Sequence, residues 1–234
     1  ARLKTIVAVF AKHGFRNVAE RIKLDSFLLK QSSPSADVEH LSIPERLRLA
    51  FEELGPTYVK LGQLLATRPD LIPEEYIVEF SKLHDQVSPL PYSSLEEVLR
   101  TELKDYFNDF SSIESQPLGS ASIAQVHRAK LKTGESVVVK IQRPGLTETI
   151  ENDLNVLFFI AELLEKYVPE TRIYNPQAIV EEYFKTLELE TNFVVEANNL
   201  RRLQINFAED SKIKIPKVYW DYCTEKVLVM EALE

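Results

Sequence analysis

The spacing of apolar residues changes abruptly in the middle of the chain, and this change constrains the fold more than any other feature. Ser120–Ala129 and Ser136–Ile141 are β-rich runs, and the short turn Lys132–Gly134 joins them. Two such runs on either side of a glycine-containing turn predict an antiparallel hairpin. Helical periodicity precedes and follows this hairpin, so the sequence predicts an α+β domain behind a helical extension.

Most of the first hundred residues carry helix signals. Ile43–Glu45 places a proline in a first helical turn, and Gly55–Pro56 ends that helix. A second helix is expected over Thr57–Thr67, and a third is expected after Pro73. Ser93–Leu103 opens with serines three residues before glutamates, the signature of a capping box, which predicts one more helix.

The second half of the chain combines strands with further helices. Helical periodicity covers Leu146–Tyr167 and Pro176–Leu187 and continues to Asn206, and short β-like runs follow. We expect one antiparallel sheet with a helix over Glu190–Phe207 packed against it. The predicted strands are Ile113–Gln116, Ile123–Leu131, Ser136–Gln142, Lys217–Trp220 and Lys226–Met230, and Ile213–Ile215 is a further β-like run.

Composition excludes several classes of protein. The 234 residues are 44% hydrophobic and 27% charged, which is typical of a folded protein and not of a disordered one. The 28 basic and 36 acidic residues give a net charge of −8, which argues against nucleic-acid binding by bulk charge. A single cysteine, Cys223, excludes a disulfide scaffold, and the four histidines form none of the close pairs typical of a metal enzyme.

The apolar runs are too short to cross a membrane. Val156–Ala161 is the longest strongly apolar run, whereas about 18–20 residues are needed to span a bilayer. Ile6–Ala11 is likewise too short for a signal peptide, so we expect an intracellular, cytoplasmic protein. An amphipathic N-terminal helix in contact with the cytoplasmic face of a membrane is the alternative to a helix packed on the protein itself.

Small side chains dominate the tip of the predicted hairpin, from Gly119 to Ala124. Small side chains let backbone N–H groups approach a polyphosphate closely, as in other phosphate-binding loops. A tight turn whose small residues merely pack is the alternative. The segment alone does not choose between these two interpretations.

Lys140 follows three valines in the second β-rich run. A lysine among apolar strand residues is costly to bury unless an anion or a carboxylate pairs with it. In kinase-type nucleotide sites such a lysine binds the α- and β-phosphates and pairs with a helix glutamate. Glu190 and Glu196 lie on a later helical segment and are the candidate partners, whereas an exposed lysine at a strand end is the alternative.

Several motifs occur together in a specific order. Tyr58–Gln63 contains Lys-x-Gly-Gln and precedes Arg68–Pro73, and the runs Leu118–Ala129, Val139–Gly145 and Glu190–Asn199 come later. With these motifs, the chain from about residue 44 to its end resembles the UbiB/AarF family of atypical, protein-kinase-like proteins. The ordered combination of the Lys-x-Gly-Gln motif with an alanine-rich loop makes this resemblance specific.

The resemblance implies roles for individual residues. Lys140 would contact the nucleotide phosphates, and Glu196 would pair with it from the helix equivalent to αC of protein kinases. Lys60 and Gln63 share one helix face and would belong to an N-terminal extension that folds across the active site, although an exposed amphipathic helix is the simpler alternative. The alanine-rich loop over the nucleotide would consist of Leu118, Gly119, Ser120, Ala121, Ser122, Ile123, Ala124, Gln125 and Val126.

Two further features follow from the same resemblance. Glu190 resembles the first acid of the family's Glu-x-Asp motif, which contacts the Lys-x-Gly-Gln region, but Asn192 stands where the second acid is expected. This departure removes one negative charge near the phosphate site. Met230 would begin the hinge between two lobes, where backbone groups of Glu231 and Leu233 bond adenine; a strand that simply leaves the sheet is the alternative.

The sequence predicts two domains. Residues 1–106 form an all-helical extension with Ser32–Ser35 as the best linker candidate, and residues 107–234 form a kinase-like N-lobe with a helical insertion at about 146–188. The sequence has no His-x-Asp and no Asp-Phe-Gly motif, and His84–Asp85 lacks the required spacing. We therefore expect a piece of a longer protein, whose C-terminal lobe would supply the catalytic aspartate and the Mg²⁺ ligands.

Three functions agree with these features. The first is the ATP- or ADP-binding part of an atypical kinase or ATPase, which the resemblance associates with isoprenoid quinone (ubiquinone) biosynthesis or lipid homeostasis. The second is a regulatory pseudokinase or scaffold switched by nucleotide, which Asn192 favours. The third is a lipid-binding helical module that presents Ile150–Val168 to an isoprenoid or a membrane. The expected partners are thus an adenine nucleotide and a membrane surface or isoprenoid lipid, and not a nucleic acid.

Overall fold

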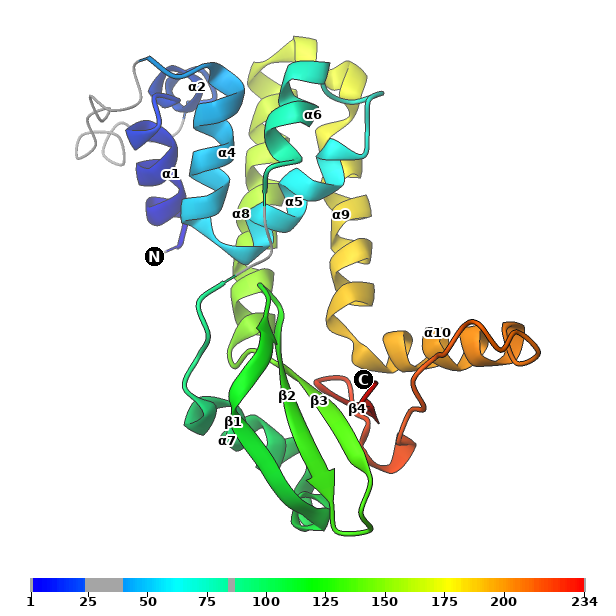
Figure 1. Cartoon of the computed structure of the whole chain (residues 1–234). Coiled ribbons are helices and arrows are strands. Elements are labelled where there is room, and N and C mark those ends of the chain that lie inside the picture. The colour runs from blue at the N-terminus through cyan, green and yellow to red at the C-terminus, as the bar shows by residue number, and fades with distance from the viewer. Residues whose placement is uncertain (1, 24–39, 84–86, 234) are drawn as a thin grey trace. The chain divides into compact units, whose positions relative to one another are not determined.

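The computed structural model describes residues 2–23, 40–83 and 87–233, which group into two compact units (Figure 1). One unit, called the helical unit here, comprises Ala1–Asp85 with Thr147–Lys185. The other, called the sheet unit, comprises Gln86–Leu146 with Thr186–Glu234. The predicted linker Ser32–Ser35 and the His84–Asp85 pair lie outside the described residues, and the predicted domain boundary at residue 106 stays a prediction.

Helices alone build the helical unit. Its elements are α1 (Arg2–Lys12), α2 (Arg16–Arg21), α4 (Ile43–Leu54), α5 (Pro56–Ala66), α6 (Glu74–Phe80), most of α8 (Leu146–Tyr167), the 3-10 helix η3 (Pro169–Tyr174) and the first part of α9 (Pro176–Thr191). Within the described residues, none of the helices is both long enough and apolar enough to span a bilayer.

The start and stop signals in the sequence explain where these helices begin and end. Ser42 and Glu45 form a capping box at the start of α4, in which the Glu45 carboxylate accepts the Ser42 N–H at 2.8 Å. Gly55 then takes a positive φ of 99°, a conformation that glycine adopts without steric cost, and Pro56 opens α5. Pro73 precedes α6 directly, so the three helices predicted here are confirmed.

A four-stranded sheet and two long helices build the sheet unit. The strand order is β1-β2-β3-β4 and every neighbouring pair is antiparallel, which confirms the predicted α+β fold. The elements are α7 (Tyr92–Leu103), the 3-10 helix η2 (Lys104–Asp109), β1 (Phe110–Ser120), β2 (Ala124–Leu131), β3 (Ser136–Gln142), α10 (Phe193–Asn206), the 3-10 helix η4 (Trp220–Tyr222) and β4 (Val227–Glu231).

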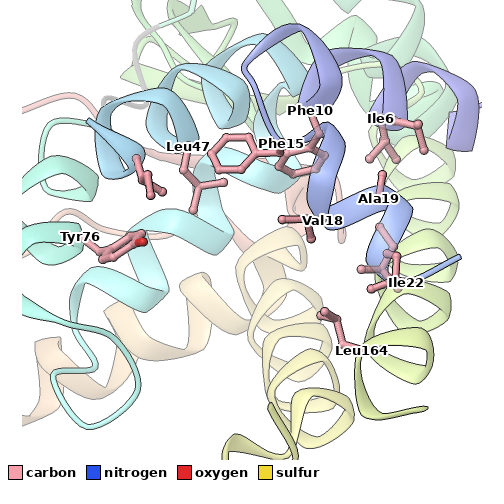
Figure 2. A pocket seen from close by; sticks show the side chains of 12 residues that line it. Ile6, Phe10, Phe15, Val18, Ala19, Ile22, Leu47, Tyr76 and Leu164 are labelled. Atoms are coloured by element: carbon pink, nitrogen blue, oxygen red, sulfur yellow. The ribbon is translucent and has the colours of Figure 1, made fainter. Parts of the chain in front are cut away.

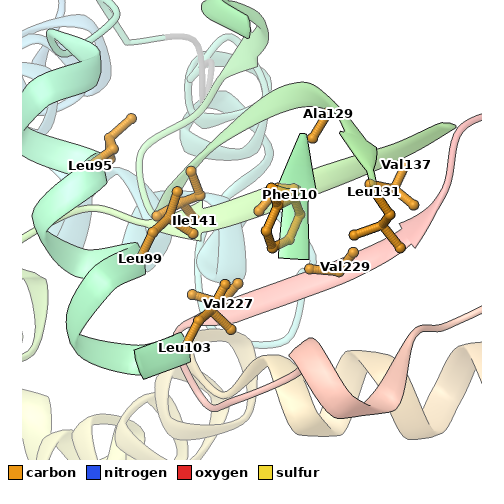
Figure 3. Packing of buried hydrophobic residues seen from close by; sticks show 11 residues of the cluster. Leu95, Leu99, Leu103, Phe110, Ala129, Leu131, Val137, Ile141, Val227 and Val229 are labelled. Atoms are coloured by element: carbon orange, nitrogen blue, oxygen red, sulfur yellow. The ribbon is translucent and has the colours of Figure 1, made fainter. Parts of the chain in front are cut away.

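Alternation along β3 gives the sheet two different faces. Val137, Val139 and Ile141 are fully buried, and they pack against one side of α7 (Figure 3). Leu95, Leu99 and Leu103 recur every four residues on α7 and point into the same cluster. We call this the covered face of the sheet.

The opposite face carries the intervening residues of the same strands. Register places Val138 beside Met230, and Lys140 between Val126 and Leu228, so these five side chains share one face. Helix α10 packs against β4. We call this the site face, because it holds the one lysine of the β3 strand.

Four details of the prediction are wrong. The capping box near Ser93 is absent, because α7 already begins at Tyr92 and its serines lie inside the first turn. The segment Lys217–Trp220 is not a strand: it makes only an isolated bridge to β4 at Val218, and no strand forms over Ile213–Ile215. Pro216 separates these two runs, and a proline has no N–H to donate to a strand ladder.

The fourth error is the continuous helix predicted over Glu190–Phe207. The helix is interrupted at Asn192, between α9 and α10. The side-chain oxygen of Asn192 accepts the Val194 N–H at 3.0 Å and so caps α10. The prediction that β4 joins the sheet that contains Lys140 is confirmed, since Lys140 pairs with Leu228.

Candidate functional site

The ammonium group of Lys140 forms an ion pair with α10. Its Nζ atom donates to the Glu196 carboxylate at 2.6 Å, within the expected reach, so the predicted ion pair is confirmed. The Lys140 side chain is 25% exposed and that of Glu196 is 39% exposed. A pair this open to water contributes about 1 kcal/mol or less to stability, so packing of the fold does not depend on it.

An aromatic ring also holds the Lys140 side chain in place. The Nζ atom lies 4.8 Å from the ring centroid of Phe193, the first residue of α10, which is almost completely buried. Cation–π attraction and the carboxylate of Glu196, one helical turn further on, fix the ammonium from two sides. The ammonium is therefore preset on an apolar face and retains access to solvent, as an anion-binding group requires.

The alanine-rich segment is a tight, packed hairpin turn. Ser120 pairs with Gln125 across the ends of β1 and β2, and the N–H of Ala121 donates to the Ala124 carbonyl at 2.8 Å. Ser122 and Ile123 at its tip are buried, whereas Leu118 on β1 is half exposed. The tip of the turn is thus packed, whereas Gly119 at its start is exposed.

Polar side chains support this turn on the covered face. The amide of Gln125 is completely buried and bonds both backbone groups of Leu90, with its oxygen at 2.9 Å from the N–H and its nitrogen at 3.3 Å from the carbonyl. The same nitrogen lies 2.9 Å from Nε2 of buried His127. His127 Nδ1 lies 2.7 Å from the Glu114 carbonyl and must donate to it, so Nε2 accepts from Gln125. Every polar atom of Gln125 and His127 is therefore bonded.

Arg143, the first residue after β3, completes the support. Its Nε donates to the Ala121 carbonyl at 2.8 Å, and its Nη2 donates to the Ser88 carbonyl at 2.9 Å and the Ser120 hydroxyl at 2.8 Å. Sequence reasoning missed Arg143, Phe193 and the Gln125–His127 pair. The only available signal was the presence of polar residues within otherwise apolar or small-residue runs.

The end of β4 carries the predicted hinge. The N–H of Glu231 donates to the Lys217 carbonyl at 2.8 Å, and that of Ala232 donates to the Ser136 carbonyl at 3.1 Å. An adenine ring bonded at Glu231 would therefore have to use its carbonyl, because the N–H already has an acceptor. Met230 lies on the site face beside Val138, and Leu233 is partly exposed just beyond β4.

Comparison with known proteins shows which family the chain belongs to. The family model described as the ABC1 atypical kinase-like domain matches residues 82–234, which contain the whole sheet and Lys140. The chain belongs to the UbiB/ABC1 family of atypical kinase-like proteins.

Relatives of known name support this assignment to the UbiB/ABC1 family. The chain is 44% identical over 194 residues to the "Probable protein kinase UbiB" of Pseudomonas fluorescens Pf-5, a match that covers 82% of this chain and 36% of the relative. A Pseudomonas aeruginosa PAO1 protein of the same name is 43% identical over 192 residues, with 80% and 36% covered. The chain thus spans little more than a third of the length of these relatives.

A solved structure is similar to this UbiB-family chain as well. It is that of Rv3197 from Mycobacterium tuberculosis in complex with erythromycin, with a TM-score of 0.55 and 29% sequence identity. The similarity covers 78% of this chain and 46% of that one. The kinase-like fold of the UbiB-family chain is therefore supported by sequence and by structure.

The Lys-x-Gly-Gln motif lies on α5, in the helical unit. A Cβ atom on Gly62 would come within 2.3 Å of Leu83 and 3.0 Å of Phe51, so glycine allows α5 to approach its neighbours. The Gln63 amide donates to the Leu83 carbonyl at 3.2 Å. Lys60 belongs to this unit and Glu190, at the end of α9, to the sheet unit, so the contact expected between them stays a prediction.

Two chemical features of the UbiB-family site remain. Asn192, where the resemblance predicts the second acid of a Glu-x-Asp motif, is the N-cap of α10, a position at which asparagine and aspartate are both favoured. Over residues 2–23, 40–83 and 87–233, no three His, Cys, Asp or Glu side chains cluster in a way that could hold a metal ion.

Proposed function

We propose that this chain forms the adenine-nucleotide-binding part of a UbiB-family kinase-like protein. The observation that carries the proposal is the preset Lys140 ammonium, 2.6 Å from Glu196, on the sheet face that also carries Val126 and Leu228. A polyphosphate needs a fixed cation, which Lys140 would supply on this face. ATP or ADP is the ligand that the kinase-like family implies.

Each residue would have a distinct task. Lys140 would bind the α- and β-phosphates, and Glu196 and Phe193 would hold its ammonium in position. The turn Gly119–Ala124 would bring backbone N–H groups toward the phosphates, and Val126, Val138 and Met230 would contact the adenine ring from the site face. Mg²⁺ would neutralise phosphate charge, held by residues that the family places in a C-terminal lobe.

The activity of the whole protein belongs to the same proposal. Relatives named probable protein kinase UbiB support a kinase-like phosphotransferase or ATPase, with a role in isoprenoid quinone biosynthesis or lipid homeostasis. A regulatory pseudokinase switched by nucleotide is the alternative. Turnover by the complete protein distinguishes the two, because a nucleotide switch binds ATP without consuming it.

Calorimetry with ATP and ADP, with and without Mg²⁺, tests nucleotide binding. We expect weak binding and no turnover by residues 1–234, because the aspartate that would orient an attacking hydroxyl or water is expected in a C-terminal lobe. Lys140→Ala should abolish the binding heat, whereas the matched control Lys130→Ala, which removes an exposed lysine of β2, should leave it unchanged. Binding that survives Lys140→Ala would refute the site assignment. ATP hydrolysis by residues 1–234 that disappears in Lys140→Ala would refute the account of the chemistry.

A second candidate function is supported by an apolar cavity in the helical unit (Figure 2). The cavity has a volume of about 360 Å³, within the range of small-molecule pockets. Aromatic and aliphatic side chains line it, among them Phe10, Phe15, Leu47 and Leu164. Ile160 and Leu164 come from α8, within the stretch predicted to form a lipid-binding face, so we propose that a hydrocarbon chain of a lipid binds here.

Liposome co-sedimentation tests the lipid-binding candidate. Leu164→Asp places a charge in the cavity wall and should reduce binding to vesicles that contain an isoprenoid lipid. Phe159→Asp, an exposed position on the same helix outside the cavity, is the matched control. Equal loss in both variants would locate binding on the helix surface instead of the cavity.

A further inference from the structure

The apolar cavity of the helical unit limits the kind of lipid that fits it (Figure 2). Of the twelve described residues that line it, Tyr76 alone carries a polar side-chain atom, so the wall suits hydrocarbon. A dry cavity of about 150 Å³ holds one benzene ring, so a volume of about 360 Å³ accepts roughly 14 carbon atoms. The cavity therefore fits one hydrocarbon chain of moderate length and is too small for the two chains of a membrane phospholipid.

Arg46 of α4 lies beside the wall of this cavity, near its mouth. Val18 and Ile43 line the cavity and are about half exposed, so they mark where it opens to solvent. Arg46 follows Ile43 by three residues on the same helix, which places both side chains on one face. The guanidinium carbon lies 5.5 Å from the ring centroid of Phe15, another lining residue, and a Cβ on Gly14 would collide with its Nη1 atom. A cation is thus held beside the entrance to an apolar space.

The Arg46 guanidinium lacks an anionic partner within the part of the chain that the structure describes. Its Nε atom is buried there and bonds no acceptor. The acidic residues of the same helix are engaged by other donors: Glu45 by Ser42, Glu52 by Arg48 and Glu53 by Lys12. A buried N–H without an acceptor destabilises the folded state, and an anion at the cavity mouth would supply the acceptor.

We propose that the cavity and Arg46 together bind a single-chain carboxylate, with its hydrocarbon chain in the cavity and its carboxylate on the Arg46 guanidinium. This inference rests on the lipid-binding function proposed for the cavity, and it narrows the ligand to a free anionic amphiphile of about 14 carbons or fewer. The planar fork of arginine donates two parallel N–H bonds to a carboxylate, and burial of the chain removes apolar surface from water. Neutral isoprenoids lack the anion, and two-chain phospholipids exceed the volume.

Equilibrium dialysis of the 234-residue chain with radiolabelled dodecanoate and dodecanol, both below their aggregation concentrations, tests the two parts of the site. We expect dodecanoate to bind roughly tenfold more tightly than dodecanol, because only the carboxylate forms a charged pair with Arg46. Leu164→Asp should abolish binding of both ligands, since it places a charge in the cavity wall.

The outcomes separate this inference from the lipid-binding function itself. Equal affinity for dodecanoate and dodecanol would overturn the role of the anion and leave the lipid-binding function standing. If neither ligand binds, or if both still bind to Leu164→Asp, the cavity is not the site and both proposals fail. Affinity for carboxylates should also rise from octanoate to dodecanoate and level off near about 14 carbons. A steady rise to eicosanoate would overturn the single-chain fit.

Substitution of Arg46 tests the cation directly. Arg46→Gln should weaken dodecanoate binding roughly tenfold and leave dodecanol binding nearly unchanged. The matched control Arg16→Gln removes an exposed arginine of the same unit, which Glu20 already pairs at 3.0 Å, and should change neither affinity. Equal losses in the two variants would assign the preference to bulk charge and overturn the proposal. If Arg46→Gln does not fold, the preference of the wild-type chain for dodecanoate over dodecanol decides.

Discussion

The two faces of the sheet come from alternate residues of the same strands, yet polar side chains are completely buried on one face and partly exposed on the other. On the covered face, Gln125 and His127 are completely buried and each polar atom has a partner. On the site face, Lys140 and Glu196 are paired but remain partly exposed. Fully satisfied buried groups give rigidity, whereas a half-exposed pair is available to a ligand. The comparison therefore separates residues that maintain the fold from residues that would perform its function.

The largest expected effect is on the covered face. Leu99→Ala removes a side chain with no solvent exposure from the α7 cluster and should lower the free energy of unfolding by about 3 kcal/mol. Leu118→Ala, at a half-exposed leucine of β1, should cost less than about 0.5 kcal/mol. Urea denaturation of both variants checks the contrast. Equal losses would mean that the two positions do not differ in packing as described.

The buried polar network should give the next largest effect. His127→Ala removes one of the hydrogen-bond partners of the Gln125 amide and the donor to the Glu114 carbonyl, and should destabilise the protein by about 2 kcal/mol. A double-mutant cycle with Gln125→Ala should show that the two losses are not additive, because the side chains share one hydrogen bond. Additive losses would argue that the two residues act independently.

On the site face, the effect on stability should be small and the effect on binding large. Lys140→Met keeps an unbranched apolar stem but removes the ammonium, and Glu196 is exposed enough to return to water. The free energy of unfolding should fall by about 1 kcal/mol or less, while nucleotide binding is lost. A loss of more than about 2 kcal/mol would instead make Lys140 a structural residue.

The sequence predicts those features that depend on residues close together in the chain. The hairpin, the helix starts at Ile43 and after Pro73, and the Lys140 strand all depend on residues close in sequence, and the structure agrees with them. The partner of Lys140 is 56 residues away and was predicted through the family resemblance. Without such a resemblance, long-range partners cannot be read from local patterns.

The missed features depend on tertiary contacts. Arg143 bonds Ser88, which is 55 residues distant, and Gln125 bonds Leu90 across 35 residues, so neither pattern is visible locally. From the sequence alone Asn192 indicates only a lost charge, because its capping bond to Val194 depends on the helix break. In each case a polar side chain forms a hydrogen bond with a backbone group. Many polar residue types can form such a bond, so the residue type alone does not predict it.

The smallest effect should come from Glu231, where the edge of the sheet meets water. Its carboxylate lies 3.0 Å from the Lys214 ammonium and accepts the Lys217 N–H at 3.3 Å. These contacts, that with Lys214 foremost, lower the pKa of Glu231 below its ordinary value of 4.5. The carboxylate therefore stabilises the folded state above about pH 4.5, and this contribution is lost as the pH falls through the lowered pKa.

Comparison of Glu231→Gln with the wild-type chain measures that contribution. At pH 6 the variant should unfold at a slightly lower urea concentration. Its free energy of unfolding should be lower by only about a few tenths of a kcal/mol, because water and salt screen an exposed pair. The difference should shrink as the pH falls through the lowered pKa and also when salt is raised. A difference that persists at pH 2 would show that the glutamine disturbs packing, and one of several kcal/mol would place Glu231 among the buried groups of the covered face.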